Sequence, residues 1–350
     1  MATPRCSRWA AQVYAANSST IFAFAFLVGV GVTKTLLTKL LFAHSPTPVA
    51  FSILSCVATD ICLLPILLYK GEPIGLSLKQ LGSFAGICLA IAIDLACQNV
   101  ALAILSVALQ QCIKATLPTA TVLVESIIRR KRFHWAIYVT VVAICVGPIL
   151  VASGSSWKAK SEAGSQTYGG VMMLLAVVGG AFKYVLCHKM IKEFQEQMGV
   201  LAFTFWVEIF VGSMLLPWAL LNGEARKMIF ETENTAAQWA GMWVVAAIGG
   251  VRVIAQFYFL AKTSATSLAM SGVVMQALTI LIGIAAFGTP LTALLATGVL
   301  ATIGTSSVYA WLKTSSVLDA PAIPPADAQT EMETRIGLRA ADSANVLSAG

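Results

Sequence analysis

Charged residues are scarce in this sequence. Asp, Glu, Lys and Arg make up only 11% of its 350 residues and 58% are hydrophobic, whereas soluble domains are about 25% charged and about 45–50% apolar. This composition excludes a soluble enzyme, a disordered chain and a nucleic-acid-binding protein. The net charge of +7 is small for this length, and it is explained by the Lys and Arg residues that membrane proteins carry in cytoplasmic loops.

Groupings of metal-binding or catalytic side chains are also lacking. The eight cysteines include no C-x-x-C pair, and the three histidines, His44, His134 and His188, are scattered. Neither paired aspartates nor a histidine cluster appears. We therefore interpret the cysteines as small apolar packing residues. We predict that the chain is not an enzyme and that it needs no metal or other cofactor.

Hydrophobic runs, by contrast, are long and frequent. A helix that crosses about 30 Å of hydrocarbon needs about 20 mostly apolar residues. The sequence therefore predicts an all-α polytopic membrane protein with about ten transmembrane helices. The predicted spans are 20–43, 48–69, 81–103, 105–127, 134–154, 168–190, 199–221, 238–260, 264–287 and 290–312.

Three regions follow from these spans: residues 1–19 as an N-terminal tail, residues 20–314 as the membrane domain, and residues 315–350 as a disordered tail. The last region is rich in Ala, Asp, Glu and Pro, a composition that does not support a packed core. The N-terminal residues resemble neither a cleavable signal nor a transit segment.

The distribution of Lys and Arg predicts the orientation. With the N-terminus in the cytosol, 14 of the 23 basic residues fall in cytosolic segments and 4 in the opposite loops, namely Lys158, Lys160, Arg226 and Lys227. Basic residues are enriched on the cytoplasmic side of membrane proteins. We therefore expect an even number of helices and both termini in the cytosol.

The two halves of the chain resemble each other weakly. A shift of 157 residues places Ser106 on Thr263, Ala108 on Ala265 and Gly147 on Gly304. It also places the fourth and fifth spans on the ninth and tenth. Five helices per half is an odd number, so the halves would have opposite topologies. Such a 5+5 inverted repeat is typical of transporters, which bind substrate between the repeats near the membrane midplane.

Lys114 is the most informative of the ionisable residues inside the spans, because it lies near the middle of a span. Gln111, Lys114, Pro118, Thr121 and Glu125 follow one another at steps of three and four residues, so they share one face of a helix. Charged residues inside membranes face the bundle interior or a water-filled cavity. An alternative is that Asp94, on the neighbouring helix, neutralises Lys114.

Other predicted helices carry polar faces of the same kind. Basic residues slightly outnumber acidic ones inside the spans, which favours an anionic substrate, because Lys binds phosphate as a point charge and Arg as a bidentate fork. Arg252 either pairs with Glu208 or contacts this substrate. Lys39 lies near a span end, where it can snorkel or pair. The polar faces on the other predicted helices are formed by Asp94, Gln98 and Asn99 in the span 81–103; by Arg252 and Gln256 in the span 238–260; and by Thr302, Thr305, Tyr309 and Lys313 at the span 290–312. Tyr309 and Lys313 can alternatively act as interfacial anchors.

Several of these residues carry a resemblance to a known family. Gln98–Leu102, Ser106–Pro118 and Arg130–Trp135 resemble a characteristic block of the triose-phosphate and nucleotide-sugar transporter family, within the drug/metabolite transporter superfamily. Smaller similarities to the same family lie at Thr38-Lys39, at Thr263–Ser267 with Gly272, and at Tyr309 with Lys313. The resemblance covers about 20–314, the membrane domain.

The resemblance implies ten helices, an inverted repeat, and alternating access by rocking of the halves. It implies antiport of a phosphorylated sugar against phosphate or a nucleoside monophosphate, with Lys114 and Lys313 on the phosphate groups. Plastid-type translocators of this family follow the last-helix Lys with Arg. Here Thr314 follows, as in the nucleotide-sugar branch. Met275 stands where that branch usually has Lys, and Arg252 where it has Asn.

We therefore expect a nucleotide-sugar antiporter in the Golgi or endoplasmic reticulum membrane. The alternatives are a plastid-type sugar-phosphate/phosphate translocator, or an exporter of the same fold with a non-phosphate substrate. Its partners would be substrate, counter-substrate and membrane lipid, with no nucleic acid; a homodimer is left open. The expected substrate-binding residues are Lys114, Lys313, Tyr309, Gln111, Gln98, Asn99, Arg252 and Lys39.

Overall fold

A computed structural model describes residues 4–71, 78–129, 160–194, 198–231, 235–263, 265–287 and 292–314, with isolated positions between 139 and 150. Within these residues the chain is helical. The helices are α1 Pro4–His44, α2 Pro48–Lys70, α3 Leu78–Ile104, α4 Val107–Lys114, α5 Leu117–Arg129, α7 Lys160–Phe194, α8 Val200–Leu221, α9 Glu224–Arg226, the π-helical η1 Lys227–Glu231, α10 Ala236–Lys262, α11 Ala265–Phe287 and α12 Ala293–Thr314.

The predicted membrane class is confirmed. Among the described helices, seven segments are long and apolar enough to span a membrane, and the predicted span at 134–154 falls largely outside the described residues. Helices α11 and α12 each contain a shorter apolar stretch. The total of about ten spans stays a prediction. The seven are Ile21–His44, Pro48–Lys70, Phe84–Ile104, Val107–Ile128, Gly164–Ile191, Val200–Leu221 and Ala236–Lys262.

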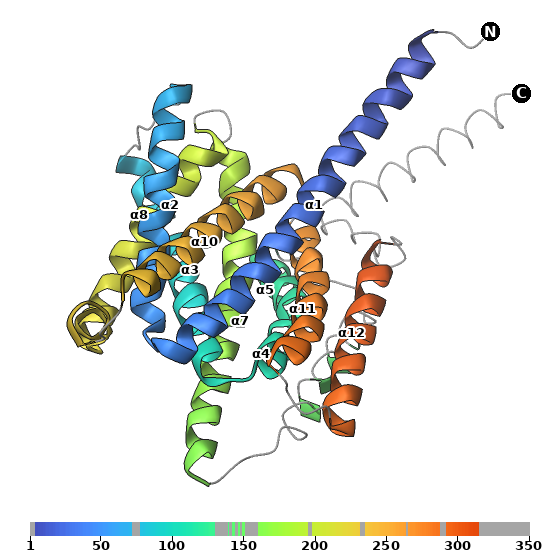
Figure 1. Ribbon diagram of the computed structural model, residues 1–350. Helices are drawn as coiled ribbons and strands as arrows, with labels where there is room; N and C mark the ends of the chain where they lie inside the picture. Colours follow the sequence, from blue (N-terminus) through green and yellow to red (C-terminus); the bar gives the residue numbers. More distant parts are fainter. Residues whose placement is uncertain are drawn as a thin grey trace, which may run out of the picture.

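The helices form a bundle in which α1 lies between two groups (Figure 1). On one side α2 packs against α8 and α10; on the other α11 packs against α4 and α12. Helix α1 contacts both α10 and α11, while α3 lies along α7 and also contacts α8. The core between them includes five of the predicted packing cysteines, Cys56, Cys88, Cys97, Cys112 and Cys187.

Glycines bring two pairs of helices to backbone contact. A Cβ atom on Gly179 of α7 would lie 3.0 Å from both the Ala90 carbonyl oxygen and the Asp94 nitrogen of α3. A Cβ on Gly250 of α10 would lie 3.1 Å from the Thr59 Cα of α2. Small residues permit such close helix approach inside membranes. The α3–α7 contact places the Asp94 side chain opposite the next turn of α7.

The predicted span at 105–127 corresponds to one membrane-spanning segment, Val107–Ile128, but the helix breaks within it, between α4 and α5. Ala115 and Thr116 form a turn, and the Thr116 hydroxyl donates to the Ile113 carbonyl at 2.7 Å. The cause is Pro118, which lacks the N–H that would bond the carbonyl four residues earlier. Gln111, Lys114 and Thr121 nevertheless remain buried, and Glu125 is half-buried.

Two side chains form hydrogen bonds with backbone groups at the ends of helices that are distant in sequence. Glu224 Oε2 accepts the backbone N–H groups of Val49 at 2.6 Å and Ala50 at 3.1 Å, at the start of α2. Lys39 Nζ donates to the carbonyl oxygens of Leu102 and Leu105, both at 2.8 Å, at the end of α3. Helix ends otherwise leave these backbone groups without partners. The contacts place the end of α8, the start of α2 and the ends of α1 and α3 on one side of the bundle.

The close contact between α3 and α7 predicts that a larger side chain at Gly179 lowers the stability of the protein. Gly179→Val forces a side chain against the α3 backbone and should destabilise the protein by about 1–3 kcal/mol. Gly170→Val is the control, since nothing lies within 4 Å of a Cβ there and the helix is the same. Thermal unfolding in detergent measures both. Equal losses for the two variants would contradict a tight contact at Gly179.

The Glu224 contact predicts a matched pair of outcomes. Glu224→Ala removes the acceptor at the start of α2 and should cost about 0.5–2 kcal/mol, as loss of an N-cap does. Burial raises the pKa of the Glu224 carboxyl above its ordinary value, so a neutral amide is tolerated in its place. Glu224→Gln should therefore keep most of the stability in the same melting assay. An equal loss in both variants would mean that the charge, rather than the acceptor, stabilises α2.

Candidate functional site

Cations from four helices share one region of the bundle. Lys34 of α1, Lys114 of α4 and Lys183 of α7 are exposed by 3%, 5% and 9% respectively, and Arg252 of α10 is half-buried. The charges of Lys34, Lys183 and Arg252 all act on Lys114, as does that of Asp94. Each buried charge is costly inside a membrane and requires a partner or a function.

Asp94 is committed to one of these cations. Its Oδ2 atom lies 3.0 Å from Lys183 Nζ, in a buried ion pair. The alternative in which Asp94 pairs directly with Lys114 is therefore wrong for the described conformation, because Lys183 takes this contact. The glycine contact between α3 and α7 explains the choice, because it brings Lys183 onto Asp94. Lys114 is consequently left without this carboxylate.

Neutral amides surround Lys114 instead. Lys114 Nζ donates to Gln98 Oε1 at 2.6 Å. Gln110 Nε2 donates to the Gln98 carbonyl at 3.3 Å, and Gln111 Nε2 donates to Gln110 Oε1 at 2.6 Å. The structure thus brings Lys114, Gln98 and Gln111 together, as the sequence predicted. An amide orients the ammonium but does not neutralise its charge.

Lys34 is a member of this cluster that the predicted site omitted. Its Nζ atom lies 3.5 Å from Asn99 Oδ1, and Asn99 Nδ2 donates to Ser52 Oγ at 2.7 Å. Asn99, a predicted site residue, therefore holds a second lysine next to the Lys114 group. The signal was present in the sequence, since Lys34 lies near the middle of the predicted span 20–43.

Arg252 faces a narrow cavity of about 10 Å³, which it lines with Gln256, Tyr184, Ser271 and Met275 among others. Its Nε atom is buried and has no hydrogen-bond partner among the described residues, and neither does Gln256 Nε2. Of the two expected alternatives for Arg252, an ion pair with Glu208 is not found among the described residues, and contact with a substrate stays a prediction. The cavity has room for about one water, so the described conformation leaves no space for a larger ligand beside Arg252.

Three predicted residues lie apart from this cluster or outside the described side chains. Lys39 reaches the end of α3, where it caps carbonyl groups, and this confirms the expectation that it could find a partner near a span end. Tyr309 and Lys313 lie on α12, and the structure describes their backbone but not their side chains. Their predicted contacts with phosphate stay predictions.

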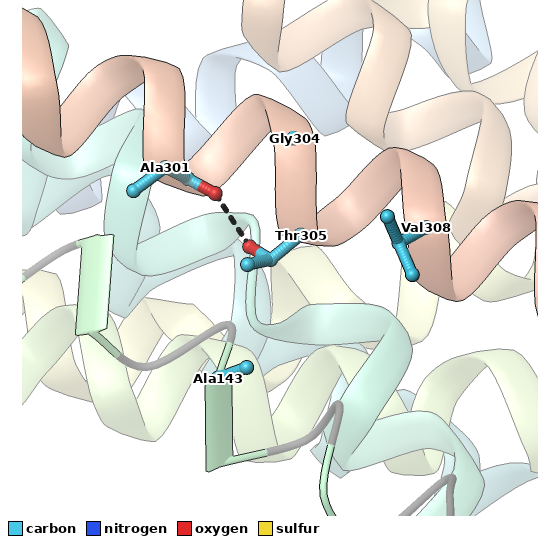
Figure 2. A pocket seen from close by; sticks show the side chains of 5 residues that line it. All are labelled: Ala143, Ala301, Gly304, Thr305 and Val308. Atoms are coloured by element: carbon cyan, nitrogen blue, oxygen red, sulfur yellow. Dashed lines mark hydrogen bonds between the residues drawn. The ribbon is translucent and has the colours of Figure 1, made fainter.

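Another cavity, of about 310 Å³, lies along α12 (Figure 2). Ala143, Ala301, Gly304, Thr305 and Val308 line it. The single hydroxyl among them, on Thr305, donates to the Ala301 carbonyl at 2.6 Å. This described lining offers no charged group to a ligand, so the smaller cavity, where Arg252 and Gln256 keep unused donors, marks the candidate site.

The arrangement is suited to binding an anion. Within the described cluster the Asp94 carboxylate forms an ion pair with Lys183, and Arg252 keeps an unused donor. Charge-assisted hydrogen bonds from Lys and Arg are the strong contacts that proteins make with phosphate. Since no ion pair engages Lys114 or Lys34 among the described residues, an anion would be their natural partner.

Comparison with known proteins assigns the family. Residues 19–310 match the model of the Triose-phosphate Transporter family. A relative, UDP-uronic acid transporter 1 of Arabidopsis thaliana, is 27% identical over 198 residues, which are 55% of this chain and 61% of that protein. The match therefore spans less than two thirds of the relative's length.

A solved crystal structure has a similar fold. It superimposes with a TM-score of 0.59 at 13% sequence identity, covering 86% of this chain and 99% of that one. The family match extends over most of the chain, includes all of the cation cluster, and agrees with the membrane-spanning helices. The chain therefore belongs to the Triose-phosphate Transporter family.

Proposed function

We propose that the protein exchanges a nucleotide sugar, or a related phosphorylated sugar, for a nucleoside monophosphate or phosphate across the membrane. The observation that carries this proposal is the buried Lys114, whose side chain is held by the neutral Gln98 and not by an acid. Lys34 and Arg252 add further positive charge in the same region. A phosphate group would neutralise this surplus.

The named relative supports a substrate with this chemistry. Its name states that it transports UDP-uronic acid, which carries a diphosphate and a sugar carboxylate. Arg252 offers a buried donor with no partner, and a guanidinium binds either anionic group in bidentate fashion. In the proposal Lys114 and Arg252 hold the charged groups. Gln98 orients Lys114 and Asn99 orients Lys34, and Gln111 lines the same site through Gln110.

The closed cavity supports alternating access. A ligand pocket for a molecule of drug size is roughly 300–1,000 Å³, whereas the polar cavity beside Arg252 is about 10 Å³. Substrate entry therefore requires helices to move apart. The proposed 5+5 repeat would supply the motion by rocking one half against the other. Lys313 and Tyr309, on α12, would then approach the phosphate from the second half.

The proposed location is the Golgi or endoplasmic reticulum membrane, with both termini in the cytosol. The described contacts agree with this topology in one respect. The end of α8 and the start of α2, which Glu224 joins, fall on the same side in the predicted orientation. The basic residues of η1 and its surroundings would then face the lumen.

Exchange in reconstituted liposomes tests the function. Vesicles preloaded with uridine monophosphate should take up labelled UDP-sugars, and empty vesicles should not, because antiport requires a counter-substrate. A panel of UDP-sugars, sugar phosphates and inorganic phosphate identifies the branch. Uptake of sugar phosphate against phosphate alone would support a translocator of the plastid type. Absence of exchange with every phosphorylated compound would overturn the proposal.

Lys114 provides the sharpest single substitution. Lys114→Ala should lower exchange about 100-fold, because loss of a buried charge contact costs about 2–5 kcal/mol. Without substrate its thermal stability should be unchanged or higher, since the substitution removes a buried cation that has no acidic partner. Lys114→Arg should retain partial binding, because the charge remains while its geometry changes.

The control for this substitution is Lys70→Ala, which removes a positive charge from an exposed position at the end of α2. It should leave exchange unchanged. If Lys114→Ala transports normally, or fails only because the protein unfolds, Lys114 does not bind the phosphate.

A further inference from the structure

The break between α4 and α5 leaves one backbone carbonyl without its usual partner. In a continuous helix the N–H of residue 118 would bond the carbonyl of Lys114, and Pro118 has no N–H. The neighbouring groups are satisfied locally, since the Ala115 N–H bonds the Gln111 carbonyl at 2.9 Å and the Thr116 N–H bonds the Ile113 carbonyl at 3.1 Å. The missing bond therefore belongs to the residue that carries the candidate phosphate ligand.

Gln276 of α11 replaces this bond. Its Nε2 atom donates to the Lys114 carbonyl oxygen at 3.2 Å, across 162 residues of sequence. The side chain is only 1% exposed. A carbonyl is an acceptor only, so it fixes which end of the amide faces Lys114. The Oε1 atom is consequently left over, and it is buried with no partner among the described residues.

Lys114 is thus held at both ends by different helices. Gln98 of α3 holds its ammonium, and Gln276 of α11 holds its backbone. A displacement of α11 relative to α3 must therefore shift the ammonium relative to its amide partner. A fully structural brace would satisfy both polar atoms of a buried amide, because an unpaired one costs about 1–3 kcal/mol. The unpaired Oε1 indicates that Gln276 is only partly engaged in the closed conformation.

We propose that Gln276 is a positioning residue: it takes the carbonyl that Pro118 frees and thereby ties the placement of Lys114 to the position of α11. This inference rests on the proposed role of Lys114 in binding phosphate. Gln276 acts through the Lys114 backbone and does not itself contact the phosphate. Its effect therefore depends on Pro118, which a direct contact with substrate would not.

A double-substitution cycle isolates this dependence. Gln276→Met removes the donor while keeping a side chain of similar length, and it should raise the KM for UDP-sugar and for phosphate roughly tenfold. Pro118→Ala introduces a backbone N–H that can bond the Lys114 carbonyl. In that background, adding Gln276→Met should change KM less than about twofold. An equal effect of Gln276→Met in both backgrounds would overturn the proposal and indicate a direct contact with substrate or a packing role.

Melting temperatures in detergent, without substrate, provide the second measurement. Gln276→Met should lower the melting temperature by roughly 2–6 °C with Pro118 present and by much less in the Pro118→Ala background. If the Gln276→Met single variant does not fold but the double variant with Pro118→Ala does, the proposed link between Gln276 and the Lys114 carbonyl is supported. If neither variant folds, the proposal is wrong. Absence of exchange by the wild-type protein would instead overturn the proposed function, while the melting cycle still decides the brace.

Discussion

Positive charge inside a low-dielectric bundle is the constraint on which the rest of this structure depends. An ammonium group inside the membrane must find a carboxylate, a set of dipoles or a ligand. Lys183 has the carboxylate of Asp94, Lys39 has the carbonyls at the end of α3, and Lys114 and Lys34 have only amides. The lysines with carboxylate or carbonyl partners therefore stabilise the fold, and the lysines with only amide partners remain available to an anion.

The helical membrane class and the bounds of several helices followed from the sequence, because membrane insertion imposes length and hydropathy on each helix. The spans at 48–69, 199–221 and 264–287 match α2, α8 and α11 to within a residue. The break after Lys114 was not predicted, although Pro118 was visible. Whether a proline kinks or interrupts a helix depends on which group donates to the freed carbonyl. Here the donor is Gln276 on α11, which local sequence patterns cannot reveal.

The sequence predicted which polar residues share a helix face, but not which charged side chains pair between helices. Helical spacing correctly grouped Lys114 with Gln111, and it predicted the Gln98 and Asn99 face that contacts both lysines. It could not decide which cation would take Asp94, because that depends on how closely α3 and α7 approach at Gly179. Lys34 was omitted from the predicted site although its position near the middle of a span was visible in the sequence, because its partner Asn99 lies on another helix.

The contact of α10 with α2 has a mechanical consequence. At Gly250 the α10 backbone lies directly against Thr59, whose hydroxyl and Cα would be 2.6 and 3.1 Å from a Cβ atom on the glycine, so sliding or separation at this point is more restricted than where side chains from both helices mediate the packing. For two bodies that rock against each other, such a point acts as a fulcrum. Atoms near it move little, and displacement grows with the length of the lever arm. The same small rotation would therefore move α12, on the far side of the bundle, much further than α2.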